Sequence, residues 1–397
     1  MKLAARIARI GPSPTLHITA TAKAMTSQGL DVVDFAAGEP AWDTPDFVKA
    51  AAKAAIDAGF TKYTPVGGIP ELKAAIVHKL ARDHGVQYDP SQIIVSCGAK
   101  HALYNLAQVL FDPGDEVIIP APYWVSYPEI VRLADATPVF LPTQESMQYA
   151  IDPKALEACI TPQTKALILN SPCNPTGTLY TRQTLEAVAT IALRHNLIII
   201  SDEIYETLVY DGAQHISPIS LTPDLLAQTV VVNGVSKSFA MTGWRIGYAA
   251  GPQDIITAMT HLQSQSTSNP SSIAQKAALA ALQSDGTFCH TLVADLIRKR
   301  DFMIQQLNTM PGITCPLPSG TFYAFPNVSA LLGRESRQGP LHTPSDLATY
   351  LLHEAHVACV PGEPFGATQH LRLSYTGDWE VLKRGLARME AAIRALT

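Results

Sequence analysis

Residues 197–202, Leu-Ile-Ile-Ile-Ser-Asp, change from four consecutive aliphatic side chains to two polar ones. A strand-sized run without alternating polar residues is typical of a strand that is covered on both faces of its sheet. Other short β-rich runs share this character, and stretches with helical periodicity separate them. The strand-like runs lie at 92–96, 116–119, 165–170 and 229–232, and the helical stretches lie at 102–110 and 185–195. This alternation predicts an α/β layer with a largely parallel sheet.

Polar residues gather where the predicted strands end. Segments 96–100, 170–175, 202–205 and 233–237 bring glycine, asparagine, aspartate, serine and lysine to these positions. Ligands of open α/β sheets bind outside the carboxyl ends of the strands. We therefore expect the four loops to meet in one crevice and to form one site.

The rhythm of the sequence changes after about residue 290, which indicates a second domain. Shorter strand-like pieces occur at 321–325, 357–360 and 371–375, and an amphipathic helix starts near Trp379. A chain of 397 residues also exceeds what one core usually supports. We predict a large domain over 46–289 and a smaller, discontinuous α+β domain formed by 1–45 and 290–397.

The composition argues against several classes of partner. Apolar residues make up 47% of the chain and charged residues 16%, as in ordinary globular proteins. A net charge of −5 without a basic stripe argues against nucleic-acid binding. The longest apolar runs are far shorter than the roughly 20 residues of a membrane helix. Charges interrupt the apolar residues of segment 1–9, so we expect no secretion signal.

The six cysteines are scattered along the chain. They form no Cys-x-x-Cys pair and have no neighbouring histidine at the spacing of metal ligands. We interpret them as reduced thiols of a cytoplasmic protein, and we expect no metal site.

Lys237 carries the strongest chemical signal. It follows a predicted buried strand, where desolvation lowers the pKa of an amine and makes it a usable nucleophile. Arg245, eight residues later, offers a forked donor that matches a phosphate, and Ser236 offers a hydroxyl. A strand-end lysine alone is usually a solvated surface residue. The combination instead favours a lysine that holds pyridoxal 5′-phosphate (PLP) as a Schiff base.

Asp202 follows the aliphatic run quoted above and is expected to be buried. A buried carboxylate needs a cationic partner or hydrogen bonds, so a helix cap or a structural salt bridge is one interpretation. The other interpretation is an acid that keeps the pyridine nitrogen of PLP protonated, because Lys237 follows Asp202 by 35 positions.

Three further positions have both a structural and a functional interpretation. Gly98, Ala99 and Lys100 open a helix, so they form either an ordinary tight turn or an anion site for the cofactor phosphate. Trp124 is either a core residue or a ring that stacks on the pyridine. Asn174, in Asn-Pro-Thr-Gly, is either a turn residue or a donor to the ring oxygen, a role shared with Tyr205.

These motifs occur in an order that resembles the class I aminotransferases, which are fold type I PLP enzymes. The chain is similar over nearly its whole length to subgroup Ib of the aspartate aminotransferases. The motifs are Ala-Gly-Glu-Pro at 37–40, Lys-Tyr at 62–63, Pro-Tyr-Trp at 122–124, Asn-Pro-Thr-Gly at 174–177, Ser-Asp-Glu-Ile-Tyr at 201–205, Ser-Lys at 236–237, Gly-Trp-Arg at 243–245 and Arg-Leu-Ser at 372–374.

The resemblance implies a role for each site residue. Lys237 would be the Schiff-base lysine and proton shuttle, with Asp202 on the pyridine nitrogen. Arg372 would clamp the substrate α-carboxylate beside the backbone of Gly38. The remaining cofactor contacts would be Asn174 and Tyr205 to the ring oxygen, Trp124 on the ring face, and the backbone of Ala99 and Lys100 with Ser236, Arg245 and the partner subunit's Tyr63 on the phosphate. The resemblance thus implies a homodimer.

The chain departs from the family pattern at positions that we expect to lie next to the substrate, so the resemblance defines substrate specificity less firmly than cofactor binding. Ala41-Trp42 stands where the subgroup usually has Asp-Phe, and Cys173 where it usually has Asn. Segment 262–270 has no cation to pair with a distal carboxylate, so Lys100 is the candidate, unless its side chain points to solvent. Thr15 with Lys100 resembles a pair that accompanies prephenate use in some members.

The resemblance implies ping-pong transamination between L-aspartate and 2-oxoglutarate. The alternative is an additional activity with prephenate as acceptor, which gives arogenate. A PLP-dependent lyase or decarboxylase would share every cofactor residue and is separated only by its products. A PLP-sensing transcription regulator would need a DNA-binding domain ahead of the fold, yet Gly38 already belongs to the expected substrate site.

Overall fold

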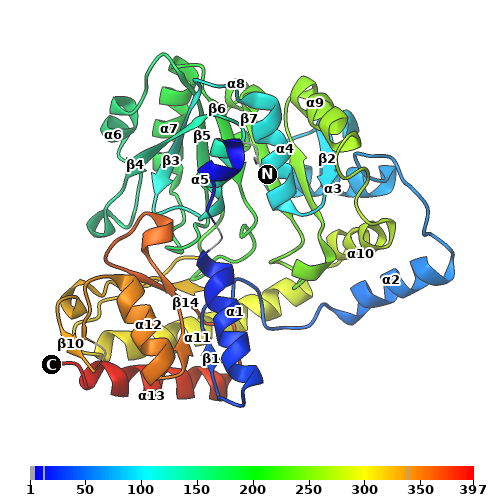
Figure 1. Cartoon of the computed structure of the whole chain (residues 1–397). Helices are drawn as coiled ribbons and strands as arrows, with labels where there is room; N and C mark the ends of the chain where they lie inside the picture. The colour runs from blue at the N-terminus through cyan, green and yellow to red at the C-terminus, as the bar shows by residue number, and fades with distance from the viewer. Residues whose placement is uncertain (1–4, 12–13, 338) are drawn as a thin grey trace.

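A seven-stranded sheet forms the centre of the larger part of the molecule in this computed structural model, which describes residues 5–11, 14–337 and 339–397 (Figure 1). Only β8 runs antiparallel to its neighbours, and the other adjacent pairs are parallel. The strands, in spatial order, are β2 (Ile93–Ser96), β8 (Gly247–Ala250), β7 (Thr229–Gly234), β6 (Ile198–Asp202), β5 (Thr164–Asn170), β3 (Glu116–Ala121) and β4 (Thr137–Pro142). The predicted α/β class with a mostly parallel sheet is confirmed.

Helices cover both faces of this sheet because successive strand residues point to opposite sides. Ile199 of β6 packs in a core with α7 (Arg182–Arg194), whereas Ile200 packs on the other face against α4 (Ala99–Leu110). The helices α5 (Ser126–Leu133) and α9 (Gln253–Ser264) lie on the α4 face, and α3 (Pro70–His84) covers the opposite face near β2 and β8. Further helices around the sheet are α2 (Asp46–Asp57), α6 (Pro153–Ala158), α8 (Pro223–Ala227) and α10 (Ser272–Leu282).

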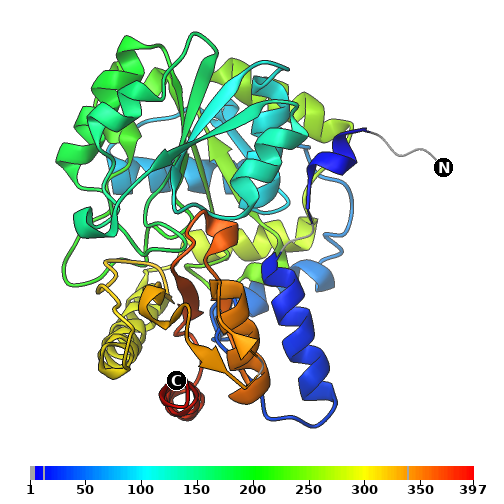
Figure 2. The same cartoon turned by 60° about the vertical axis from the view of Figure 1, so that its left-hand side comes forward.

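Elements from the two ends of the chain form a second group, which lies below the sheet in Figures 1 and 2. The strand β1 (Val33–Asp34) pairs in parallel with β12 (Val357–Ala358). The strands β13 (Val360–Pro361), β14 (Leu371–Ser374) and β9 (Tyr323–Ala324) form an antiparallel sheet. The other elements are α1 (Pro14–Ser27), α11 (Thr287–Thr309), β10 (Glu335–Ser336), β11 (Gly339–Pro340), α12 (Pro344–Glu354) and α13 (Trp379–Arg394).

One hydrophobic core joins the two ends of the chain. Val33 and Phe35 pack with residues of α11, α12 and α13. The predicted boundary at 289–290 falls inside α11, and the boundary at 45–46 falls at the first residue of α2. The exact domain limits stay a prediction.

Within the described residues, no helix combines the length and the apolar character needed to cross a membrane.

Candidate active site

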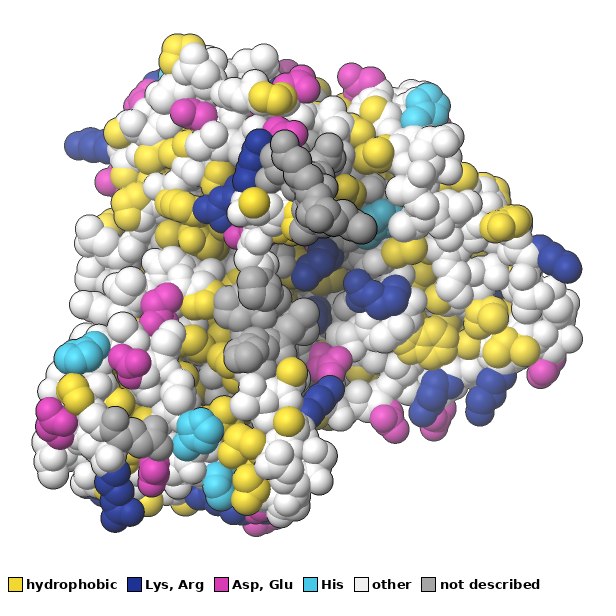
Figure 3. Space-filling model, in the orientation of Figure 1, with side chains coloured by type: hydrophobic (Ala, Val, Ile, Leu, Met, Phe, Trp, Pro, Cys, Tyr) yellow, Lys and Arg dark blue, Asp and Glu magenta, His cyan; other side chains and the backbone are white. Residues whose placement is uncertain are grey.

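A cavity of about 520 Å³ opens where the carboxyl ends of the sheet strands face β14 and the segment after β1. Figure 3 shows lysine and arginine side chains gathered in a hollow between the two groups of elements. The cavity brings together most of the residues that the sequence singled out. These are Gly38, Ala99, Lys100, Trp124, Asn174, Asp202, Tyr205, Ser236, Lys237, Arg245 and Arg372.

Two predicted site residues, Gly98 and Tyr63, do not line this cavity, and a third, Thr15, has a side chain outside the described part of the structure. Gly98 lies directly behind it as the cap of α4. Tyr63 is 92% exposed and does not reach the cavity of its own chain. Thr15 belongs to the first turn of α1, but its side chain lies outside the described part of the structure, so its substrate contact stays a prediction.

Lys237 follows β7 and directs its amine into the cavity. Nζ donates a hydrogen bond to the carbonyl oxygen of Gly38 at 2.6 Å. Burial disfavours the ammonium form and lowers the pKa of Lys237 to about 8, although the nearby Glu39 carboxylate opposes the shift. The amine is therefore much closer to its neutral, nucleophilic form at neutral pH than a solvated lysine.

Asp202 is the last residue of β6 and is buried. One carboxylate oxygen accepts a hydrogen bond from the Tyr127 hydroxyl at 2.7 Å, and the other accepts one from the backbone N–H of Ile204 at 3.2 Å. Burial raises its pKa to about 6, against the opposing effect of the Tyr127 hydrogen bond. Tyr127 in turn makes an edge-to-face contact with Trp124, with ring centroids 5.3 Å apart.

The N-terminus of α4 meets Ser236 and Arg245. We call Gly98, Ala99, Lys100, Ser236 and Arg245 the anion cradle. The backbone N–H groups of Ala99 and Lys100 occupy the first turn of α4, where a helix offers no acceptor, so they are free to bind an anion. Gly98 has φ +91°, and a Cβ there would lie 2.5 Å from Nη2 of Arg245. Only glycine lets the guanidinium approach this closely.

Arg372 of β14 is buried on the opposite side of the cavity. Its guanidinium donates to the carbonyl of Ala36 at 2.9 Å and to Oδ1 of Asn174 at 3.1 Å. It also lies 4.3 Å from the ring centroid of Tyr323. Among the described residues, its buried Nε has no hydrogen-bond partner. A buried cation that is only partly satisfied by the protein is suited to hold a carboxylate.

Several cavity residues were missed by the sequence analysis. Tyr127 and Tyr323 bond to Asp202 and Tyr205, respectively, the latter pair with hydroxyls 3.0 Å apart. Lys23 of α1 adds a cation to the cavity wall. Tyr127 lies three residues after Trp124, in the first turn of α5, and the two rings are in contact. Nothing in the local sequence marks Tyr323 or Lys23.

Lys100, the predicted partner of the distal carboxylate of the substrate, lies at the cavity wall. Its ammonium stands 4.8 Å from the ring centroid of Trp124. Partial burial and the neighbouring Arg245 lower its pKa. The departures from the family pattern lie elsewhere, since Trp42 and Cys173 do not line the cavity. Trp42 packs under the Lys299 ammonium at 4.5 Å, and the Cys173 thiol contacts the carbonyl of Pro122 at 3.6 Å.

The fold and the site together define a class, the α/β enzymes of fold type I. A family model described as aminotransferase class I and II matches residues 30–389. The chain belongs to the aminotransferase class I and II family.

Named relatives agree with this assignment. The chain is 49% identical to an aspartate aminotransferase from Geobacillus stearothermophilus, with all of both chains covered. It is 48% identical to an aspartate/prephenate aminotransferase from Cereibacter sphaeroides over 98% of each chain. A solved aspartate aminotransferase structure from Rhizobium meliloti matches with a TM-score of 0.96 and 43% identity, again over all of both chains.

Proposed function

We propose that this enzyme holds PLP on Lys237 and moves an amino group between L-aspartate and 2-oxoglutarate. The observation that carries the proposal is the single cavity shared by the Lys237 amine, the Asp202 carboxylate, the anion cradle and Arg372. The names of the relatives, aspartate aminotransferases among them, support the choice of substrates.

The donor set fits each part of PLP. The anion cradle matches a phosphate, because Arg245 and two free helix N–H groups face the same space. The Lys237 amine matches the aldehyde, and Asp202 matches a protonated pyridine nitrogen. Asn174 and Tyr205 would contact the ring oxygen, and Trp124 would stack on the ring. The lack of a Cβ at Gly98 keeps the cradle open.

Each residue would then have its own role in the two half-reactions. When bound, PLP supplies an electron sink for the bonds that break at the substrate α-carbon. Asp202 would hold a proton on the pyridine nitrogen and so maintain that sink. Arg372 would fix the substrate carboxylate through its guanidinium. Lys237, once displaced by the substrate amine, would take the α-proton and return it as general base and acid. Product release between the halves gives ping-pong kinetics.

A panel of amino donors and 2-oxo acids tests the proposal. Aspartate and glutamate should convert the cofactor absorbance to that of its aminated form, and 2-oxoglutarate should restore it. Each turnover should yield one 2-oxo acid and conserve the amino group. Release of carbon dioxide or free ammonia in step with turnover would instead identify a decarboxylase or lyase.

Prephenate is a second candidate acceptor. The relatives named for its use are the Cereibacter sphaeroides protein and a bifunctional enzyme from Petunia hybrida that is 45% identical. Thr15 and Lys100 would meet the second carboxylate, which prephenate carries on its ring. Incubation with prephenate and glutamate or aspartate should give arogenate. Absence of arogenate under conditions where 2-oxoglutarate is aminated would exclude this activity.

A cytoplasmic homodimer completes the proposal. Tyr63 is exposed in the single chain, and a dimer would let it reach the partner's anion cradle. The partners are then small amino acids and 2-oxo acids together with a second copy of the chain.

A further inference from the structure

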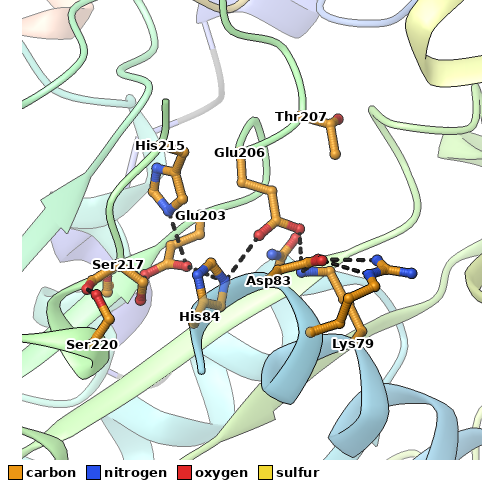
Figure 4. A network of polar contacts seen from close by, with 12 residues as sticks. Lys79, Asp83, His84, Glu203, Glu206, Thr207, His215, Ser217 and Ser220 are labelled. Carbon is orange, nitrogen blue, oxygen red and sulfur yellow. Dashed lines mark hydrogen bonds and ion pairs between the residues drawn. The ribbon is translucent and has the colours of Figure 1, made fainter. Parts of the chain in front are cut away.

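A buried polar cluster lies behind the turn that carries Asp202 and Tyr205. These two residues line the cavity, whereas Glu203 and Glu206 of the same turn point away from it toward α3 (Figure 4). Glu203 is fully buried and Glu206 is nearly so. His84, at the end of α3, and His215, in the segment after the turn, approach the two carboxylates with side chains that are 5% and 6% exposed.

The spacing of the facing atoms resembles that of metal ligands. Nε2 of His84 lies 3.4 Å from Oε2 of Glu206 and 3.8 Å from Oε2 of Glu203. Nε2 of His215 lies 3.1 Å from the same Glu203 oxygen. A tetrahedral ion with bonds of about 2.0–2.2 Å places its ligand atoms about 3.3–3.6 Å apart. One ligand atom each from His84, Glu203 and Glu206 lies within 4.8 Å of the others.

The second oxygen of each carboxylate is already held by the protein. Oε1 of Glu203 accepts hydrogen bonds from the hydroxyls of Ser201 and Ser217. Oε1 of Glu206 lies 2.6 Å from the ammonium of Lys79. These contacts orient both carboxylates so that Oε2 faces the histidines, as outer contacts do around bound metals.

The charge of the cluster requires compensation. With neutral histidines, the cations Lys79 and Arg82 accompany the carboxylates of Asp83, Glu203 and Glu206, which leaves one negative charge in excess. A bound cation or a proton on a histidine would compensate it. Protonated histidines would donate aligned hydrogen bonds. Among the described residues, Nε2 of His84 and Oε2 of Glu203 are buried without a hydrogen-bond partner. The separations of 3.4 and 3.8 Å between Nε2 of His84 and the two carboxylate oxygens are longer than ordinary hydrogen bonds and close to the spacing of atoms around a shared cation.

We propose that the cluster binds one divalent transition-metal ion, with His84, Glu203 and Glu206 as ligands. His215 would contact the Glu203 carboxylate from outside this set. Mixed imidazole and carboxylate ligands suit Zn²⁺ and leave a fourth position for water. The ion would be structural, because no part of the cluster lines the catalytic cavity. It would tie the end of α3 to the turn that positions Asp202 and Tyr205. The cysteine spacing, on which we based the expectation of no metal site, does not bear on these ligands, because none of them is a cysteine.

Metal titration of the cofactor-loaded protein tests this proposal. After treatment with a chelator and its removal, calorimetry with Zn²⁺ should show one tight equivalent per chain. Co²⁺ should give the visible bands of a tetrahedral site, at longer wavelength than the cofactor band. X-ray absorption of the Zn²⁺ form should show one imidazole nitrogen among oxygen ligands. These measurements on the wild-type chain do not depend on a variant.

A matched pair of substitutions on α3 locates the site. His84→Asn should weaken the tight equivalent at least about 100-fold, whereas His78→Asn, on the exposed face of the same helix, should leave it unchanged. Cofactor absorbance serves as the check that both variants fold. Failure of the wild-type chain to bind one tight equivalent would overturn the proposal. So would unchanged binding in His84→Asn, or nitrogen NMR showing His84 doubly protonated with Zn²⁺ present.

Discussion

At the scale of single residues, the chemistry depends on how far burial shifts two ionisable groups in one cavity. The pKa of Lys237 falls to about 8 and that of Asp202 rises to about 6, both chiefly through loss of hydration. The two shifts oppose full ionisation of either group. An incoming cofactor with a pyridinium nitrogen would stabilise the Asp202 carboxylate again, because it supplies the missing positive charge.

The rate at which PLP attaches to the cofactor-free protein should follow the ionisation of Lys237. Only the neutral amine is a nucleophile, so the rate should rise about tenfold per pH unit below pH 8 and level off above it. Stopped-flow absorbance measures this rate. Lys237→Ala should show no attachment, and borohydride reduction should label position 237 in the wild-type protein. A midpoint near 10.5, or a label on another lysine, would contradict the assignment.

Asp202→Asn should preserve the fold and abolish most activity. The amide has a similar shape but cannot stabilise a protonated pyridine nitrogen, so the cofactor withdraws electrons less effectively. The catalytic rate should fall by well over tenfold, while near-native circular dichroism should persist. Tyr127→Phe is the matched control, because it removes one hydrogen bond and leaves the carboxylate in place. A loss within tenfold, about 1.4 kcal/mol of barrier, would mean that another group supplies the charge.

Lys100→Ala should selectively weaken dicarboxylic substrates. Loss of a charge-assisted hydrogen bond to the distal carboxylate costs about 1.5–3 kcal/mol, whereas alanine has no such group. The ratio of kcat/KM for aspartate and alanine measures the effect. Lys23→Ala provides the comparison, because Lys23 also lines the cavity. Equal losses for both substrates in Lys100→Ala, or a selective loss only in Lys23→Ala, would remove this role from Lys100.

At the scale of elements, the sequence predicted the strands that carry apolar runs and missed those that do not. Gly-Tyr-Ala-Ala of β8 has low strand propensity and forms through pairing with β2 and β7 on its two sides. The strand β4 was not predicted because it contains Pro138 and Pro142. It forms nevertheless, because it lies at the edge of the sheet, where prolines are tolerated.

Local sequence patterns also predicted only part of the site. The residues at strand ends could be read from local patterns, but Tyr127, Tyr323 and Lys23 reach the cavity through packing between distant elements. The contact between Tyr127 and Asp202 joins residues 75 positions apart. A local sequence pattern does not indicate which residues so far apart along the chain come into contact.

Gly98→Ala should damage the anion cradle at the start of α4. The new Cβ would lie 2.5 Å from Nη2 of Arg245 and would displace the guanidinium. We expect PLP affinity to fall by more than tenfold. Gly114→Ala is the control, since it has a similar φ of +101° but open space around its Cβ among the described residues. Both changes strain the backbone by about 1–3 kcal/mol, so comparable melting temperatures with different PLP affinities would separate the two effects. Equal PLP affinity in both variants would contradict the role of Gly98.

At the scale of the whole molecule, the exposed Tyr63 predicts that two chains share each site. Tyr63→Phe and Lys237→Ala chains, unfolded and refolded together, should form hybrid dimers with one unaltered site. That site combines the lysine of the first chain with the tyrosine of the second. Cofactor titration of the mixture should reveal a class of sites with wild-type affinity. A mixture without such sites, or a fully active monomer in sedimentation, would rule out sharing.

The pairing of the two ends of the chain also affects the order in which the protein matures on the ribosome. A nascent chain that has emerged as far as residue 300 contains every strand of the large sheet. It lacks both β12, the partner of β1, and Arg372, which bonds to Ala36. Because domains fold as their residues emerge, the large sheet can assemble early, while residues 33–36 must wait for more than 300 others. The proposed substrate clamp is therefore among the last parts of the protein to form, so an incomplete chain that already contains the anion cradle and Lys237 would still lack the arginine proposed to hold the substrate.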